Sequence, residues 1–422
     1  MSGEGWIEAN GGATAAQLRV TQGLAAGAAG RLDNLQDEIY TRIERLRRSF
    51  QRGAPAKYAA AAPTITMGAA GAASSITGST TPAISAGAAN IATIGTLLYF
   101  NGSVYMGRHI DLVSTPGAAD STGRGWGQAV MTDSDQLEVK VRAISGQVLR
   151  FNARIDGEYY SDTDISLSGD NTDRHVLLNF GSAKPSGRKV ELFFNASAWL
   201  YGYNVTANRR VWHPTYAGEP LAMVFGDSYT DGVGSTNIRR TMVNACGSAL
   251  GISNMIASGA GGTGYINNGS SAKFITRIAD ISRFGALDLL VIAGGINDAG
   301  NSQASVTTAA TDFLNAVIAA QPKAIIAVCG PFRAPSLNPS QGVSDGIKAA
   351  FNAVKDSKRM FFIDTFANNW QNGTGKIGAT NGTGNSDFYI INSDGVHPSD
   401  DGHEYLGTNL AEAIKFGVAA LA

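Results

Sequence analysis

The feature that most constrains the fold of this chain is an alternation of short apolar runs and amphipathic segments over residues 219–422. The apolar runs are predicted as strands at 222–225, 254–257, 287–293, 324–329 and 360–364. The amphipathic segments are predicted as helices at 238–250, 272–284, 306–320, 343–356 and 403–420. Near-continuous apolar strands separated by amphipathic helices indicate a parallel sheet that is covered on both faces. We therefore expect an α/β domain here.

Polar stretches follow several of these strands. The first strand ends in Gly226-Asp227-Ser228, the second is followed by 258–265, and the third by 294–298. A further stretch, Asp394-Gly395-Val396-His397, stands just before the last helix. Ligands of parallel α/β sheets bind at the carboxyl ends of the strands. These stretches therefore stand where a site is expected.

The residue types in these stretches suit acyl transfer. A serine nucleophile needs a base, and the base needs a partner that holds it in the right tautomer. Asp394 and His397 form the one close His/Asp pair in a turn that leads into a helix, although helix capping is an alternative role for His397. Donors to an oxyanion are available from the Gly261-Gly262 turn and from Asn297, each of which has a purely structural alternative as a turn residue.

Taken together, Gly226-Asp227-Ser228, Gly262, Gly295-Ile296-Asn297-Asp298 and Asp394-Gly395-Val396-His397 resemble the four blocks of the SGNH (GDSL) hydrolases. The resemblance covers about residues 219–422 and implies a flavodoxin-like three-layer α/β/α fold. It implies Ser228 as the nucleophile, His397 as the base and Asp394 as the acid that orients it. It also implies an oxyanion hole made of the Ser228 N–H, the Gly262 N–H and the Asn297 side chain. Gly261 stays an alternative to Gly262.

Residues 94–218 have the pattern of β-structure. Residues 137–144 alternate apolar and polar side chains, as a half-buried strand does, and turn clusters separate several such segments. We expect an antiparallel β-sandwich of jelly-roll-like form. A small sandwich that runs directly into the Gly-Asp-Ser strand is similar to the two-domain carbohydrate esterases of acetyl-xylan esterase type. Its aromatic residues form either a sugar-stacking face or core and inter-domain contacts: Trp126, Tyr159, Tyr160, Trp199, Tyr201 and Tyr203.

The first 93 residues divide into a helical part (1–54) and a linker (55–93). The helix carries a narrow apolar stripe, made of Leu32, Leu35, Ile39, Ile43, Leu46 and Phe50. Such a stripe must be buried, either in a self-associating stalk or against the chain's own globular domain. We favour the stalk. The Ala/Gly/Ser/Thr-rich segment that follows is interpreted as a linker, or as a segment that neighbours in an assembly hold in place.

Composition excludes several classes of function. A net charge of −1 gives no reason to expect nucleic acid or an anionic membrane as a partner. Cys246 and Cys329 are expected to be buried thiols, and the five histidines form no Cys/His cluster, so we expect no metal and no other cofactor. The N-terminus resembles no signal peptide and no apolar run has spanning length, so we expect a soluble protein that is not exported by a Sec-type route.

These observations lead to one main functional hypothesis. We expect a serine esterase that removes short acyl groups, above all O-acetyl groups, from a polysaccharide. The residues near the site that we expect to contact substrate are Asp227, Tyr265, Phe332, Arg333 and Trp370. The helix and linker are similar to those of a phage tail spike or another virion-borne deacetylase, which predicts a homotrimer joined through the helix and a location on the virion, or otherwise in the cytoplasm. Alternatives are a lipase or thioesterase, and a receptor-binding spike without activity.

Overall fold

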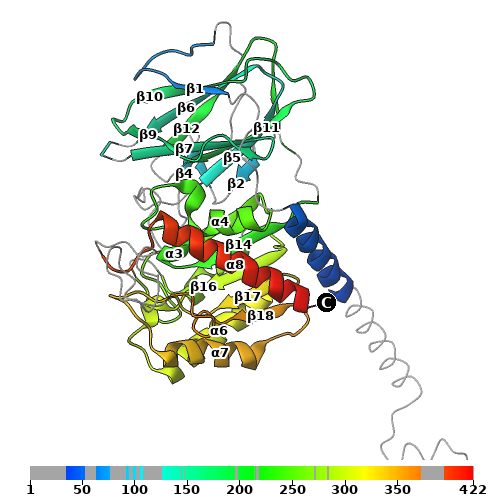
Figure 1. Ribbon diagram of the computed structural model, residues 1–422, viewed down its shortest axis with the longest axis vertical. Coiled ribbons are helices and arrows are strands. Elements are labelled where there is room, and N and C mark those ends of the chain that lie inside the picture. Colours follow the sequence, from blue (N-terminus) through cyan, green and yellow to red (C-terminus); the bar gives the residue numbers. More distant parts are fainter. Residues whose placement is uncertain are drawn as a thin grey trace, which may run out of the picture.

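The structure is a computed structural model, and it contains a β-sandwich above an α/β domain, with an N-terminal helix alongside the latter (Figure 1). It describes residues 35–52, 63–76, 92–94, 98–100, 105–107, 126–143, 145–146, 148–194, 198–212, 214, 218–269, 272–282, 285–371 and 394–421.

The α/β domain is built on one parallel sheet of five strands in the order β15-β14-β16-β17-β18. These strands are β14 (Leu221–Gly226), β15 (Asn254–Gly259), β16 (Leu289–Ala293), β17 (Ile325–Cys329) and β18 (Met360–Ile363). In chain order this is 2-1-3-4-5, the flavodoxin-like order. Ligands of such sheets bind between the first and third strands, where the strand order reverses. Gly226 lies level with both Gly259 and Ala293, so three strands end together at this point.

Helices cover both faces of the sheet, as the sequence predicts. One face carries α4 (Met242–Ala249), α8 (Asp400–Ala420) and the helix at residues 35–52; the other carries α5 (Ile278–Ser282), α6 (Gln303–Ala320) and α7 (Gln341–Val354). Strand β14 shows why both faces are apolar. Ala222 and Val224 point into one core, whereas Met223 and Phe225 point into the other. Shorter helical turns complete the domain: α3 (Ser228–Asp231), η1 (Ile238–Arg240), η2 (Phe274–Arg277) and η3 (Ile296–Asp298).

The sandwich consists of two antiparallel sheets, with strand orders β1-β10-β6-β12-β4-β3 and β13-β5-β11-β7-β8; β2 pairs with β5, and β9 with β7. Val139, Val190 and Leu192 are among the fully buried residues between them. The strands are β1 (Thr64–Met67), β2 (Ala92–Ile94), β3 (Leu98–Phe100), β4 (Tyr105–Gly107), β5 (Trp126–Thr132), β6 (Gln136–Ala143), β7 (Val148–Ile155), β8 (Glu158–Tyr159), β9 (Ile165–Ser168), β10 (Asp173–Asn179), β11 (Arg188–Phe194), β12 (Ala198–Val205) and β13 (Val211–Trp212).

Part of the predicted linker belongs to this sandwich. Strand β1 pairs with β10 along its whole length, from Thr64 opposite Asn179 to Met67 opposite Val176. Beyond β1, the Ser75 N–H and hydroxyl both donate to the buried carboxylate of Glu138, at 2.9 and 2.7 Å. The composition argument missed this strand because an edge strand gains most of its stability from backbone pairing and needs few large side chains.

The N-terminal helix packs on the chain's own α/β domain, which corrects the preference for a stalk. Ile39, Ile43 and Leu46 are buried in the same core as α4 and α8, and the helix lies beside α8 in Figure 1. The Ser49 hydroxyl donates to the carbonyl oxygens at 250 and 251, at 3.0 and 2.8 Å. Within residues 35–52 the apolar stripe is therefore used inside the chain; Leu32 lies outside the described residues.

The two domains meet through polar and aromatic contacts. The Tyr159 hydroxyl lies 3.1 Å from that of Ser248, and the Arg239 guanidinium lies over the Tyr159 ring at 4.7 Å. The Ile238 N–H donates to the carboxylate of Asp164 at 2.7 Å. Burial raises the pKa of Asp164, although this N–H and the Asn152 side chain oppose the shift.

The sandwich aromatics whose side chains the structure describes do not form one sugar-stacking face. Tyr159 is buried at the domain junction, and Tyr203 is buried inside the sandwich. Tyr201 lies beside the guanidinium of Arg142 and the ammonium of Lys140, at 5.0 and 5.4 Å from its ring centroid. The side chains of Trp126 and Trp199 lie outside the described residues.

Candidate active site

Ser228 stands directly after β14, at the first position of α3. Asp227 caps this short helix, because its Oδ1 accepts the N–H of Tyr229 at 3.0 Å. Strand β14 can end this close to β16 only with glycine at position 226, since a Cβ there would lie 2.0 Å from the carbonyl oxygen of Ala293. The Ser228 side chain is thereby fixed at the point where the strand order reverses.

Ser228, His397 and Asp394 form a continuous relay of hydrogen bonds. His397 Nε2 lies 2.9 Å from Ser228 Oγ, and His397 Nδ1 lies 2.7 Å from Asp394 Oδ2. The other oxygen of Asp394 accepts the N–H groups of Val396 and His397, at 2.8 and 3.1 Å. Burial acts to raise the pKa of Asp394, but these N–H groups and the imidazole outweigh it, and the pKa is lowered. An ionised Asp394 holds the His397 proton on Nδ1 and leaves Nε2 free to accept the serine proton.

The Ser228 N–H and the Asn297 side chain are two of the predicted oxyanion donors. The Ser228 N–H is at the start of α3, where N–H groups have no acceptor within the helix. The side-chain amide of Asn297 donates one N–H to the carbonyl oxygen of Thr263 at 2.9 Å, which fixes its orientation and leaves the second N–H available.

Gly261 and Gly262 both remain candidates for the third donor. They occupy the middle of a turn in which the Thr263 N–H donates to the carbonyl oxygen of Ala260 at 3.3 Å. Gly262 has a φ of 74°, which requires glycine, whereas a Cβ on Gly261 would lie 3.9 Å from the Cβ of Ser228. The turn therefore lies beside the serine at Gly261.

Asp298 organises the loop that follows this turn, a role that sequence reasoning did not assign to it. Its carboxylate accepts the N–H groups of Tyr265, Ile266 and Asn267, at 2.8, 3.1 and 3.1 Å. Burial raises the pKa of Asp298, and the three N–H groups oppose the shift. The motif Gly295-Ile296-Asn297-Asp298 thus contains both the predicted oxyanion donor Asn297 and the residue that shapes the neighbouring loop.

Arg277 ties together the ends of the two strands that lead to the site. It is 1% exposed, and its guanidinium donates to the carbonyl oxygens of Gly226 and Ser258, both at 2.9 Å. It also lies over the ring of Phe225 at 4.4 Å. A single arginine in a predicted amphipathic helix is read as exposed, so the sequence offers no signal for this contact.

Two further buried side chains hold the segments on either side of the relay. The Tyr229 hydroxyl donates to the carbonyl oxygen of Val396 at 2.6 Å, next to His397. His403 Nε2 lies 2.9 Å from the carbonyl oxygen of Val233, and its Nδ1 lies 3.4 Å from the N–H of Met242. Burial lowers the pKa of His403 to about 4. His403 is therefore neutral at physiological pH.

Four of the five predicted substrate contacts are buried packing residues, which corrects that expectation. Phe332 and Asp227 are fully buried, Tyr265 is 1% exposed and Trp370 is 8% exposed. Phe332 stacks on Tyr229 with ring centroids 5.1 Å apart. Burial raises the pKa of Asp227 to about 7. Arg333 differs from the other four, because part of its surface is exposed.

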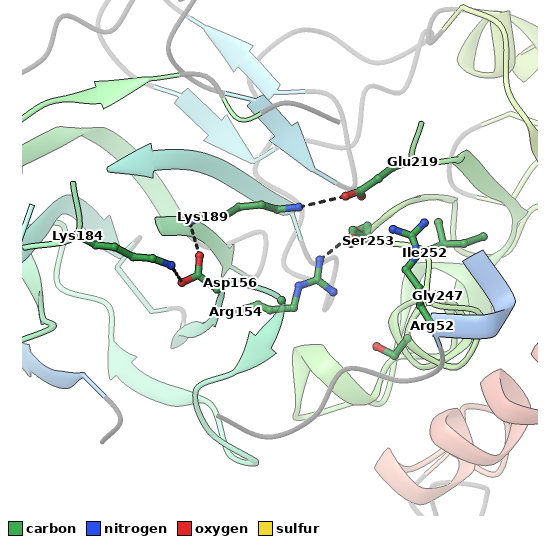
Figure 2. A pocket seen from close by; sticks show the side chains of 12 residues that line it. Arg52, Arg154, Asp156, Lys184, Lys189, Glu219, Gly247, Ile252 and Ser253 are labelled. Atoms are coloured by element: carbon green, nitrogen blue, oxygen red, sulfur yellow. Dashed lines mark hydrogen bonds and ion pairs between the residues drawn. The ribbon is translucent and has the colours of Figure 1, made fainter. Parts of the chain in front are cut away.

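A cavity of about 550 Å³ lies at the domain junction and not at the relay. Glu219 and Ser253, which line it, precede β14 and β15, so the cavity lies at the amino edge of the sheet, opposite Ser228. Two of its cations face carboxylates: Lys184 is 2.9 Å from Asp156, and Lys189 is 3.7 Å from Glu219 (Figure 2). This cavity is therefore not the ester site.

The described residues contain no group of three or more His, Cys, Asp or Glu side chains placed to hold a metal ion. Of the helices in the described ranges, none has both the length and the hydropathy needed to cross a membrane. Cys246 and Cys329 are buried free thiols, and burial raises the pKa of both.

The fold and motifs were compared with known proteins. A family model described as the GDSL-like lipase/acylhydrolase family matches residues 224–405. A comparison of the sequence with curated proteins found no match.

Several solved structures have a similar fold. The salicylyl-acyltransferase SsfX3 from a tetracycline biosynthetic pathway is 16% identical with a TM-score of 0.60, covering 82% of this chain and 98% of that one. A family two carbohydrate esterase from Cellvibrio japonicus is 17% identical with a TM-score of 0.56, covering 82% and 100%. An acetyl xylan esterase from Butyrivibrio proteoclasticus is 14% identical with a TM-score of 0.54, covering 82% and 100%. The likeness thus includes both domains.

Proposed function

Because the C-terminal domain belongs to the GDSL-like lipase/acylhydrolase family and is an SGNH-type esterase, we propose that it removes O-acetyl groups from a polysaccharide. The observation that carries the proposal is the relay from Ser228 Oγ through His397 to Asp394, with separations of 2.9 and 2.7 Å. Such a relay activates a serine for attack on a carbonyl carbon.

The mechanism follows from this geometry. Ser228 Oγ attacks the ester carbonyl carbon while its proton passes to His397 Nε2, and the carbonyl oxygen becomes an oxyanion. The N–H donors of Ser228, the 261–262 turn and Asn297 stabilise that charge. Collapse breaks the bond to the sugar oxygen, which leaves with the proton from His397. Water then loses a proton to His397 and attacks the acyl-serine, which releases acetate and restores the serine hydroxyl.

The choice of a polysaccharide ester is supported by the two-domain arrangement. The solved structures described as a family two carbohydrate esterase and an acetyl xylan esterase are covered over 100% of their length, sandwich and hydrolase domain together. In this chain the sandwich also contacts the segment that follows the nucleophile helix, through Asp164 and Ile238. Two joined domains give a long polymer more surface to lie on than the hydrolase domain alone.

The direct test is acetate release from acetylated polysaccharides by the wild type and by Ser228→Ala. We expect the variant to lose at least about 10⁴-fold in turnover, because the acyl-serine cannot form. Its thermal unfolding should match that of the wild type. Equal acetate release by the two proteins would sink the assignment of Ser228.

The length of the acyl chain separates this proposal from a lipase or thioesterase. Turnover of p-nitrophenyl acetate should exceed that of the p-nitrophenyl ester of a long-chain acid, and thioesters should be poorer substrates. A preference for the long chain or for thioesters would favour the rival function. Absence of turnover with every ester would favour a receptor-binding protein that keeps the fold without the activity.

We also propose that this esterase acts on a virion and assembles as a homotrimer. The support is the composition of the segment before the sandwich, and, since residues 35–50 pack on the α/β domain, residues 1–34 would have to make the trimer contact. Light scattering on the full-length protein should give the mass of three chains. A monomer at micromolar concentration would rule out the trimer.

A further inference from the structure

We propose that Arg333 binds a carboxylate on the substrate, so that the acetylated sugar, or the unit beside it, is a uronic acid. This inference rests on the proposed function, since it names the class of polysaccharide on which the same site would act.

Arg333 belongs to the loop between β17 and α7, which contacts both the residue after the nucleophile and the turn that carries His397. Its neighbour Phe332 stacks on Tyr229, the residue after Ser228, with an angle of 9° between the rings. Further along the loop, the Ser336 N–H donates to the carbonyl oxygen of Gly395 at 3.1 Å, two residues before His397. Arg333 is therefore at the same edge of the sheet as the relay.

The Arg333 guanidinium lacks an acceptor in the part of the chain that the structure describes. Its Nε is buried without a hydrogen-bond partner, and the group lies over the Phe366 ring at 3.6 Å from the centroid. Burial alone lowers its pKa. A buried N–H of a cation without an acceptor is costly, because this N–H has lost its water and nothing replaces it.

Arg154 and Arg359, two buried arginines among the described residues, have acceptors for several guanidinium N–H groups. Arg154 binds Glu191 through two nitrogens, at 2.6 and 2.9 Å. Arg359 is 3.1 Å from the carboxylate of Asp356 and donates to the carbonyl oxygens at 321 and 324. The contrast makes Arg333 a candidate for a group that receives its acceptor from a ligand.

The surroundings of Arg333 favour a planar anion. The backbone N–H of Arg333 donates to Gln371 Oε1 at 2.6 Å, which fixes the chain at the base of the arginine side chain. One face of the guanidinium is occupied by Phe366, so its edge, with the donors in one plane, is the part available to a ligand. That edge matches the two oxygens of a carboxylate.

The test uses two methyl glycosides with the same O-acetyl group, an O-acetyl-galactosiduronate with a free carboxylate and an O-acetyl-galactoside with a hydroxymethyl group in its place. We expect the wild type to have a kcat/KM about 10-fold or more higher for the galacturonate, the usual scale for a hydrogen bond to a charged group. Arg333→Met keeps an apolar side chain against Phe366 and should bring the ratio of the two values close to one. Arg333→Lys should retain part of the preference.

Arg52→Met is the matched control, since Arg52 lines the cavity at the opposite edge of the sheet; it should keep the wild-type ratio. An equal kcat/KM for both esters in the wild type, or an unchanged ratio in Arg333→Met, would overturn the proposal.

A binding experiment separates this proposal from the proposed function. Calorimetry of the methyl glycoside of galacturonic acid, with its carboxylate free, should show binding to Ser228→Ala. This binding should be lost in Ser228→Ala/Arg333→Met, whether or not the wild type hydrolyses the esters. Failure of the wild type to release acetate would count against the esterase. Equal binding of galacturonate and galactoside to Ser228→Ala would count against Arg333.

Discussion

The two ends of strand β16 carry two aspartates with different tasks. At the amino end, Asp288 Oδ1 accepts hydrogen bonds from Arg42 and Arg45, at 3.0 and 2.8 Å. Its Oδ2 accepts the N–H of Leu221, at the start of β14, at 2.9 Å. Asp288 therefore holds the N-terminal helix to the sheet.

At the carboxyl end, Asp298 contacts no arginine among the described residues and accepts only backbone N–H groups of the loop at 265–267. Its bonds shape the approach to Ser228, whereas Asp288 binds Arg42 and Arg45, which lie 246 and 243 positions away in the chain. One edge of the sheet is therefore built for cohesion and the other for the geometry of the site, and substitutions at the two edges should affect different measurements.

The largest effect is expected at the carboxyl edge. Asn297→Ala removes an oxyanion donor and should lower kcat by about 10²- to 10³-fold, or about 3 kcal/mol in the barrier, with little change in stability. Steady-state kinetics with p-nitrophenyl acetate measure this. Asn352→Ala, on the exposed side of α7, is the control. A near-normal kcat in Asn297→Ala would remove Asn297 from the oxyanion hole.

At the amino edge the loss should be of stability. Leu46 is fully buried, so Leu46→Ala should lower the free energy of unfolding by about 2–5 kcal/mol, as cavity-forming substitutions do. Urea denaturation measures the change. Tyr40→Ala, at a side chain that is 58% exposed, should stay within about 0.5 kcal/mol of the wild type. Equal stability of both variants would mean that the helix is not docked in solution.

A third prediction concerns the buried His403 and the dependence of stability on pH. Because the pKa of His403 is lowered to about 4 from an ordinary 6.5, the unfolded chain binds a proton between these values that the folded protein does not. The free energy of unfolding should therefore fall as the pH drops from 6.5 to 4, by on the order of 3 kcal/mol from this residue. Denaturation curves for wild type and His403→Gln test this; parallel pH profiles would contradict it.

The aspartate pair itself gives the smallest effects. Asp288→Asn should cost about 1–3 kcal/mol of stability, because it leaves two arginines without a carboxylate, and should leave kcat unchanged. Asp298→Asn should lower kcat by about 10-fold, since an amide cannot accept three N–H groups as a carboxylate does. Steady-state kinetics and urea denaturation of both variants measure the changes in kcat and in the free energy of unfolding. A kcat loss in Asp288→Asn would show that the two edges are coupled.

The sequence predicted most of what lies at strand ends and little of what joins distant segments. Ser228, Asn297, Asp394 and His397 stand in short motifs whose spacing reflects local geometry, and the five strands are apolar runs that periodicity detects. Arg277 was missed because its shortest hydrogen bonds go to backbone carbonyl groups, which leave no trace in a sequence.

The packing of the N-terminal helix and the pairing of strand β1 were not predicted from the sequence for a related reason. An amphipathic stripe shows that a helix is buried but not against what, and Ile43 finds its partners in α4 and α8, far along the chain. Strand β1 is held by backbone pairing, which does not depend on its amino-acid composition. Long-range partners are decided by tertiary packing, and a local pattern cannot identify them.

The docked helix has a consequence for synthesis. Because residues 35–52 pack against α8 at residues 400–420, the sandwich is inserted between two parts of one α/β unit, and the chain connects the two domains twice. During translation the sandwich is complete while the helix still waits for its partners. The α/β domain can close its core only after residues 400–420 have left the ribosome, so the esterase gains its activity later than the sandwich folds.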